Sequence, residues 1–162
     1  MSTQIRNRGI NVKITKSFEG TTVNVPRLKK LAKAVCQQFE ISKAIISIAL
    51  VDNAEIRKAN KRFLGRNNVT DCLSFDLSDV KSKTRSFDLL INAEKAVEEA
   101  ALRGHSSEAE LALYITHSLL HQLGFDDSTD KQAKQMHNLE DLILQQLGYG
   151  LVYNKKPKSK KR

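Results

Sequence analysis

The residues best suited to chemistry lie in one short segment, HSLLHQLGFDD, which runs from His117 to Asp127. Its two histidines are four residues apart, so on a helix both imidazoles lie on the same face. Gly124 offers the left-handed backbone conformation that often ends a helix, and two aspartates follow at once. The chain can therefore fold back over the last helical turn and bring a carboxylate beside the two imidazoles. Three such ligands, with a fourth position left to water, form a typical catalytic zinc site.

We predict that His117, His121 and Asp127 hold one metal ion per chain. Zn²⁺ is the first choice, but an imidazole–carboxylate site also accepts manganese, iron or nickel. A single histidine on an apolar helix is more often a hydrogen-bonded residue of the core than a metal ligand. Two at this spacing, followed by a glycine and two aspartates, favour a metal site over a structural role.

The helix that carries the two histidines is predicted to be buried, because the preceding run LALYIT, residues 111–116, is apolar almost all the way round. Ser107 and Glu110 have the spacing of a capping box, which predicts the start of this helix. A last helix is expected from Thr129 to Leu147, where Gly148 stops it.

The order of the remaining predicted elements indicates an α+β (mixed α/β) fold, a small sheet packed with about five helices, with the metal site at the C-terminal end of the buried central helix. The chain is expected to form one metal-binding domain over residues 1–150, followed by a basic, disordered tail over residues 151–162. The other predicted strands and helices are Ile10–Ile14, a helix from Val25 whose Pro26 suits the first turn, Ala44–Val51, Asp52–Leu64, Thr70–Leu77, Phe87–Ile91 and Ala93–Arg103.

Composition limits the class of protein. Of the 162 residues 40% are hydrophobic, an ordinary share for a globular domain, and no stretch has the roughly 18 apolar residues of a transmembrane helix. The N-terminus lacks the apolar core of a secretory signal. Cys36 and Cys72 are far apart and form no CxxC motif, so neither a disulfide scaffold nor a thiolate metal site is indicated. We therefore expect a cytoplasmic protein without a membrane partner.

The net charge of +9 makes nucleic acid the first partner to consider. However, six of these charges belong to the tail KKPKSKKR, residues 155–162, and the rest of the chain carries only +3. A solubilising tail and a tail that tethers RNA explain this run equally well.

Two families share parts of the histidine pattern. The two histidines and the following glycine are spaced as in the metzincin proteases, but those enzymes need a glutamate directly after the first histidine as general base. Here that residue is Ser118, so a metalloprotease is only a minor alternative.

The segment HSLLHQLGFDD resembles more closely the HGxLHLxGYDH signature of the YbeY family of bacterial rRNA maturation factors. Three further stretches resemble that family in the same order along the chain: TDCLSF at residues 70–75, FDLLI at 87–91 with the AxxEA-type helix after it, and the segment from Met136 to Tyr149. The resemblance covers about residues 44–149.

This resemblance implies a metal-dependent, single-strand-specific endoribonuclease that acts in the 3′-end maturation of small-subunit rRNA and in ribosome quality control. It also implies a mixed four-stranded sheet with several helices and a zinc-type site in a cleft. The implied partners are rRNA and the small ribosomal subunit, with ribosomal proteins or an assembly GTPase as further candidates.

Two departures from the family pattern bear on catalysis. At the position of the motif's third histidine this chain has Asp127. His137 is an alternative ligand, although its position off the apolar stripe of the last helix favours a place at the surface. Where the family has an arginine that serves the RNA chemistry, this chain has Leu64. Arg62 and Arg66 are the candidates for the role of that arginine. A non-catalytic ribosome-assembly factor with a structural metal is therefore the alternative function.

Overall fold

The computed structural model describes residues 9–150 and 152–153. Residues 1–8, 151 and 154–162 lie outside the described part. The tail predicted for 151–162 therefore falls almost wholly outside it and stays a prediction.

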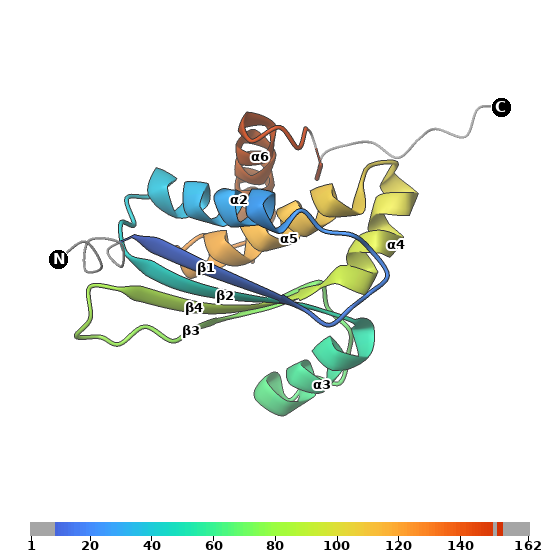
Figure 1. The fold of residues 1–162 in the computed structure, drawn as a ribbon, viewed down its shortest axis with the longest axis horizontal. Coiled ribbons are helices and arrows are strands. Elements are labelled where there is room, and N and C mark those ends of the chain that lie inside the picture. Colours follow the sequence, from blue (N-terminus) through green and yellow to red (C-terminus); the bar gives the residue numbers. More distant parts are fainter. Residues whose placement is uncertain (1–8, 151, 154–162) are drawn as a thin grey trace.

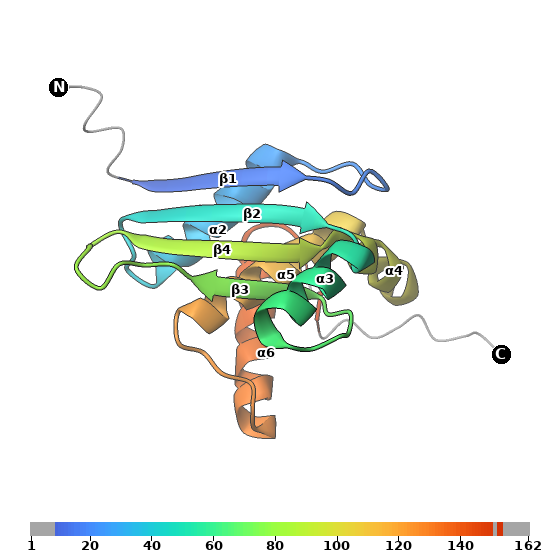
Figure 2. The ribbon, with the colours of Figure 1, turned by 90° about the horizontal axis from the view of Figure 1, so that it is seen from below.

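A mixed four-stranded sheet forms the centre of the fold, as predicted. It consists of β1 (Ile10–Lys16), β2 (Ala44–Val51), β3 (Cys72–Asp76) and β4 (Arg85–Asn92), in the spatial order β1-β2-β4-β3. β1, β2 and β4 run parallel to one another, and β3 lies antiparallel to β4 at the edge of the sheet (Figure 2).

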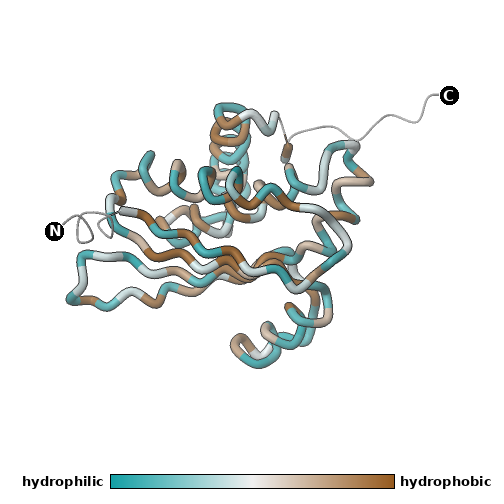
Figure 3. Tube along the Cα trace, in the orientation of Figure 1, coloured by the Kyte–Doolittle hydropathy of each residue, from teal (hydrophilic) through white to brown (hydrophobic). Residues whose placement is uncertain are grey.

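Alternation along β2 shows how the sheet is anchored. Ala44, Ile46, Ile48 and Leu50 are buried at every second position, whereas the side chain of Ile45 is half exposed. Successive side chains of a strand point to opposite faces, so one face of the sheet makes the main core and the other is only partly covered. Figure 3 shows this apolar centre along the strands.

Five helices pack on the sheet and on one another: α2 (Val25–Gln38), α3 (Asn53–Leu64), α4 (Ala93–Arg103), α5 (Ser107–Gln122) and α6 (Asp130–Gln146). α2 and α5 cover the apolar face, α4 and α6 pack against α5, and α3 lies on the opposite face (Figure 1). The predicted α+β fold class is confirmed, and α5 is the buried central helix. None of the described helices is long and apolar enough to cross a membrane.

The start of α5 differs from the prediction, because Ser106 rather than Ser107 is its N-cap. The Ser106 hydroxyl accepts a hydrogen bond from the backbone N–H of Ala109. Ser107 lies one residue inside the helix, and its hydroxyl pairs with that of Thr21. Glu110 is instead buried and hydrogen-bonded to His105, so the predicted capping box is wrong.

Both cysteines are free. Burial raises the pKa of Cys36 to about 11, and burial together with the charge of Asp71 raises that of Cys72 well above its usual value. Neither side chain therefore offers a thiolate at neutral pH, in line with the absence of a thiolate motif.

Candidate metal centre

The structure brings the three predicted ligands together. His117 and His121 lie one turn apart near the end of α5, and Asp127 lies in the segment between α5 and α6. The two imidazole Nε2 atoms are 3.0 Å apart. One carboxylate oxygen of Asp127 is 3.6 Å from the Nε2 of His117 and 3.4 Å from that of His121.

Local turns explain why the chain returns to its own helix. Gly124 has a φ of +100°, a conformation that side chains disfavour, and it reverses the chain just after α5. The N–H of Phe125 then donates to the carbonyl of Leu120, and the Phe125 ring packs edge-on against Phe39. Asp126 accepts hydrogen bonds from the N–H of Asp127 and from the hydroxyl of Ser128, so it shapes the turn that presents Asp127.

Hydrogen bonds on the far side of each ring set the tautomers of the two histidines. The Nδ1 of His121 lies 3.1 Å from the carbonyl oxygen of Phe125, and the Nδ1 of His117 lies 2.9 Å from a carboxylate oxygen of Glu140. Because these oxygens only accept, each Nδ1 carries the hydrogen. Each neutral ring therefore directs an unprotonated Nε2 toward Asp127, which is the arrangement seen behind metal-bound histidines.

The donor set fits a divalent metal. When both rings are neutral, two lone pairs and one carboxylate oxygen face one another and repel, and a cation held between them, a proton or a metal ion, relieves that repulsion. Ligands about 2.0–2.2 Å from a tetrahedral zinc ion are about 3.3–3.6 Å from one another. The separations of 3.0, 3.4 and 3.6 Å lie in or near that range. This group of residues could therefore bind a metal ion.

Glu140 lies behind the candidate metal centre, and the sequence did not indicate its role there. It is fully buried on α6, and its two oxygens accept hydrogen bonds from His117 (2.9 Å) and His137 (2.5 Å). Its spacing of three residues from His137 is the signal that could have paired those two. The contact with His117, 23 residues away, had no signal in the sequence.

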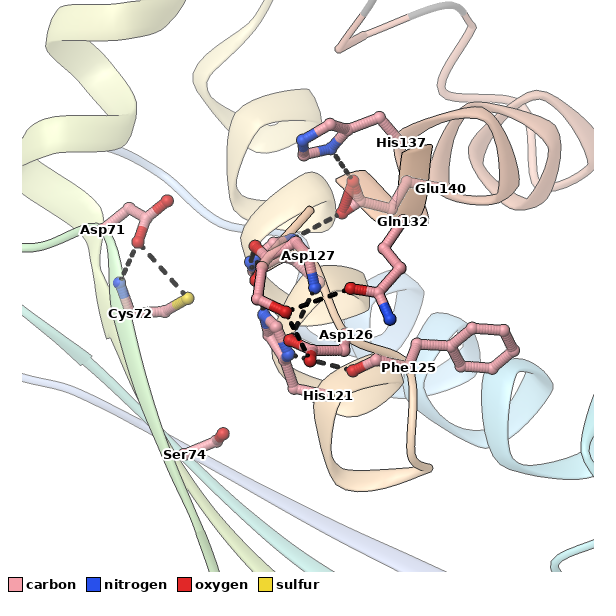
Figure 4. A network of polar contacts seen from close by, with 12 residues as sticks. Asp71, Cys72, Ser74, His121, Phe125, Asp126, Asp127, Gln132, His137 and Glu140 are labelled. Carbon is pink, nitrogen blue, oxygen red and sulfur yellow. Dashed lines mark hydrogen bonds and ion pairs between the residues drawn. The ribbon is translucent and has the colours of Figure 1, made fainter. Parts of the chain in front are cut away.

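His137 itself is not the surface residue that its position off the apolar stripe favoured. Its side chain is only 17% exposed, because the ring lies flat against Tyr153 at 3.4 Å between centroids. His117, His137 and Glu140 form a second group whose ligand atoms lie within 4.8 Å. Since Glu140 already accepts hydrogen bonds from both rings, these three residues are well explained as a hydrogen-bonded chain behind the group formed by His117, His121 and Asp127 (Figure 4).

Negative charge gathers around His117. Burial by itself lowers the pKa of His117, but the hydrogen bond and charge of Glu140, together with the charges of Asp71 and Asp127, outweigh it and raise the pKa above its usual value. The same carboxylates favour any cation bound at its Nε2.

Replacing Glu140 with glutamine is expected to weaken metal binding by about 10–100-fold, the usual effect of losing a carboxylate behind a ligating histidine. The amide has one oxygen where the carboxylate has two, so it cannot accept from both His117 and His137. Competition with a chromophoric chelator measures the affinity. Glu98→Gln on the exposed face of α4 is the matched control, and an unchanged affinity for Glu140→Gln would contradict the assigned role.

Arg62 and Arg66 are not joined to this cluster by any hydrogen bond or ion pair within residues 9–150 and 152–153. Arg62 lies in the last turn of α3, with its guanidinium over the ring of Phe63 at 5.4 Å. Arg66 is exposed just after that helix, and Leu64 is half exposed. α3 packs on the opposite face of the sheet from α5, so these arginines do not adjoin the candidate ligands, and their role as candidates stays a prediction.

A cavity of about 230 Å³ adjoins the candidate metal centre. It lies between α4, α5 and α6, and is closed on one side by Asp71, just before β3, and on another by Tyr153. His117 lines it, so the cavity and the three predicted ligands share a wall. Figure 4 shows Asp71 across the gap from the α5–α6 side chains.

Comparisons with known proteins agree with this architecture. Residues 13–148 match the family model described as Endoribonuclease YbeY. A protein of that name from Syntrophomonas wolfei is 32% identical over 155 residues, covering 89% of this chain and 96% of its own. Another, from Caldanaerobacter subterraneus, is 37% identical over 130 residues, covering 72% and 82%. The solution structure of a Thermotoga maritima protein has the same fold, with a TM-score of 0.61 at 21% identity over 93% of this chain and 99% of its own.

Proposed function

The chain belongs to the YbeY endoribonuclease family, and on this premise we propose that it is a metal-dependent endoribonuclease that cuts single-stranded RNA. Its proposed task is the 3′-end maturation of small-subunit rRNA and ribosome quality control, with the small ribosomal subunit as its partner. The observation that carries the proposal is the convergence of three acceptor atoms, from His117, His121 and Asp127, on one point.

We propose Zn²⁺ as the metal, held by those three residues. The two imidazoles suit zinc well, and aspartate is an accepted zinc ligand. The carboxylate also gives the site a higher affinity for harder ions such as manganese than a third histidine would. The predicted alternative ligand, His137, is grouped with His117 but not with His121, whereas Asp127 lies within 3.6 Å of the Nε2 atoms of both, which favours Asp127 as the third ligand.

The chemistry needs an accessible metal and a way to hold the phosphate. A divalent ion bound here would lower the pKa of water and polarise a phosphoryl oxygen. The side chains of His121 and Asp127 are about one third exposed, so a phosphodiester can reach this side of the site. Glu140 and the Phe125 carbonyl keep the rings oriented, and we assign Arg62 and Arg66 as cations that contact the RNA backbone outside the site.

The test compares cleavage of a single-stranded RNA with that of its duplex by the purified full-length protein. We expect cleavage of the single strand only, its loss after chelation, and its recovery with Zn²⁺ or Mn²⁺. Elemental analysis of the purified protein identifies the bound ion. Cleavage that persists in a protein shown to be free of metal would refute the proposal.

A second candidate function is a non-catalytic ribosome-assembly factor with a structural metal. Leu64 favours it, because the family has an arginine at that position for RNA chemistry. In this case metal removal lowers thermal stability, the protein still binds the small subunit, and RNA stays intact in the cleavage assay.

Leu64→Arg separates the two candidates. Leu64 is 50% exposed, so an arginine fits without disturbing the core. If the protein is a nuclease that lacks this cation, the change is expected to raise kcat/KM by about 10-fold, the effect of one good phosphate contact. Leu102→Arg, at an exposed leucine on α4, adds the same charge elsewhere and is the matched control. Equal rates for the two variants would show that the family's arginine position is not used here.

The protease alternative is disfavoured by the position of Ser118. This residue is 1% exposed, so its hydroxyl does not face the open side of the site where a general base is needed.

A further inference from the structure

The cavity beside His117 has a composition that the metal chemistry does not require. At about 230 Å³ it is smaller than the roughly 300–1,000 Å³ of pockets for drug-sized ligands, so it suits one planar ring system. It shares the His117 wall with the candidate metal centre, so a ligand bound in it lies next to any group held by the metal.

One wall of the cavity is aromatic. The ring of Tyr153 lies on that of His137 with an angle of 8° between their planes. Tyr153 is still 36% exposed. His137 takes one ring face, and the guanidinium of Arg103 lies over the ring at 5.6 Å from its centroid, so a ligand ring reaches Tyr153 beside this guanidinium. Two hydrogen bonds from the backbone N–H groups of Val152 and Tyr153 to Asp141 hold this segment in place. A fixed aromatic face of this kind is the platform on which single-stranded nucleic acids stack their bases.

The charges that line the cavity disfavour an anion. Four carboxylates line it, against two permanent cations: Asp71, Glu99, Glu110 and Glu140, with Lys95 and Arg103. Arg103 pairs with two of these carboxylates, Glu99 at 3.7 Å and Glu110 at 3.8 Å. Within residues 9–150 and 152–153, Lys95 forms no ion pair. Glu140 already accepts from His117 and His137, and Glu110 is bonded to His105. The polar groups left over are therefore the ammonium of Lys95 and carboxylate oxygens of Asp71 and Glu99, which suit a neutral ring that has both a donor and an acceptor.

From this wall and this polar lining we infer that the cavity binds one nucleobase of the single-stranded RNA substrate, next to the phosphate at the metal centre. The inference rests on the proposed ribonuclease function and names a base-binding subsite for it. Carboxylates accept hydrogen bonds but cannot donate them. The subsite therefore favours bases with an exocyclic amino group, such as cytosine and adenine, over uracil, whose pairing edge has two carbonyl oxygens and a single N3–H donor.

The first experiment measures binding without cleavage. Cytidine, uridine and inorganic phosphate are titrated separately into the isotope-labelled full-length protein, and NMR shifts are followed. We expect cytidine to shift the signals of Tyr153 and His137 at lower concentration than uridine does. Shifts of these signals by phosphate but not by either nucleoside would overturn the inference, because they would mark an anion site.

Variants of Tyr153 test the stacking wall. Tyr153→Ala is expected to weaken cytidine binding at least 5-fold, whereas Tyr153→Phe keeps the ring and is expected to bind as the wild type does. Leu102→Ala, at an exposed residue that does not line the cavity, is the control. Unchanged binding by Tyr153→Ala would contradict the assignment.

The second experiment separates the subsite from the nuclease function. A set of oligoribonucleotides carries one abasic nucleotide at successive positions around the cleavage point. We expect one position at which the missing base lowers kcat/KM for the wild type but not for Tyr153→Ala. Cleavage that is equally insensitive at every position would refute the base subsite while leaving the nuclease function intact. Nucleoside binding at Tyr153 without any RNA cleavage would refute the nuclease function and retain the site.

Discussion

Replacing His121 with alanine is expected to remove the bound metal and to lower RNA cleavage by about 1,000-fold or more. The change deletes one of three ligands, and the metal supplies both the activated water and the electrostatic stabilisation in such a site. The Nδ1 contact with the Phe125 carbonyl, which links α5 to the turn that carries Asp127, is lost as well.

The measurement is metal content by elemental analysis alongside the cleavage rate on single-stranded RNA. The neighbouring variant Gln122→Ala loses a hydrogen bond to Ser74 but no predicted ligand, and it should keep both metal and activity. Full cleavage by a metal-free His121→Ala protein would exclude a metal mechanism. Ribosome binding that survives in this variant, with no cleavage by the wild type, would favour the assembly-factor alternative.

The second large effect is expected at Asp127. Asp127→Ala should lower metal affinity by about 100-fold, because the site then keeps only two of its three protein ligands and loses its negative charge. Asp127→His, which restores the residue of the family motif, should retain zinc and shift the preference away from manganese, since imidazole is a softer ligand than carboxylate.

His137→Ala decides between the two third ligands considered. If Asp127 is the ligand, His137→Ala keeps the metal with only a modest loss of affinity, because His137 touches the site through Glu140. Competition titrations with Zn²⁺ and Mn²⁺ measure these affinities. A larger loss in His137→Ala than in Asp127→Ala would move the metal to the group formed by His117, His137 and Glu140.

Much of the fold could be predicted from local pattern. The short β-branched run Ala44–Val51 and the helical periodicity of several helices reflect preferences that neighbouring residues share, so the elements could be predicted to within a few residues. The mixed sheet followed from the family resemblance. The misplaced cap at Ser107 shows the limit, because two adjacent serines offer the same hydroxyl and only the packed helix shows which one lies outside it.

The convergence of the three predicted ligands could be predicted for the same local reason. Helical spacing puts His117 beside His121, and a glycine turn brings Asp127 back within six residues. Residues from distant segments could not be found in this way. Glu140, Asp71 and Tyr153 reach the site only because α6, the start of β3 and the C-terminal segment pack around α5.

The sequence by itself therefore determined which side chains of the segment from His117 to Asp127 come together, and the family of the chain, because these depend on motifs of residues a few positions apart. The tertiary structure decided what surrounds them. It showed that a buried carboxylate orients His117, that His137 lies under Tyr153 instead of at the surface, and that a cavity adjoins the ligands. The physical reason is that the burial and the hydrogen-bond partners of a side chain depend on which distant elements pack against it. The periodicity of the sequence does not indicate which elements these are.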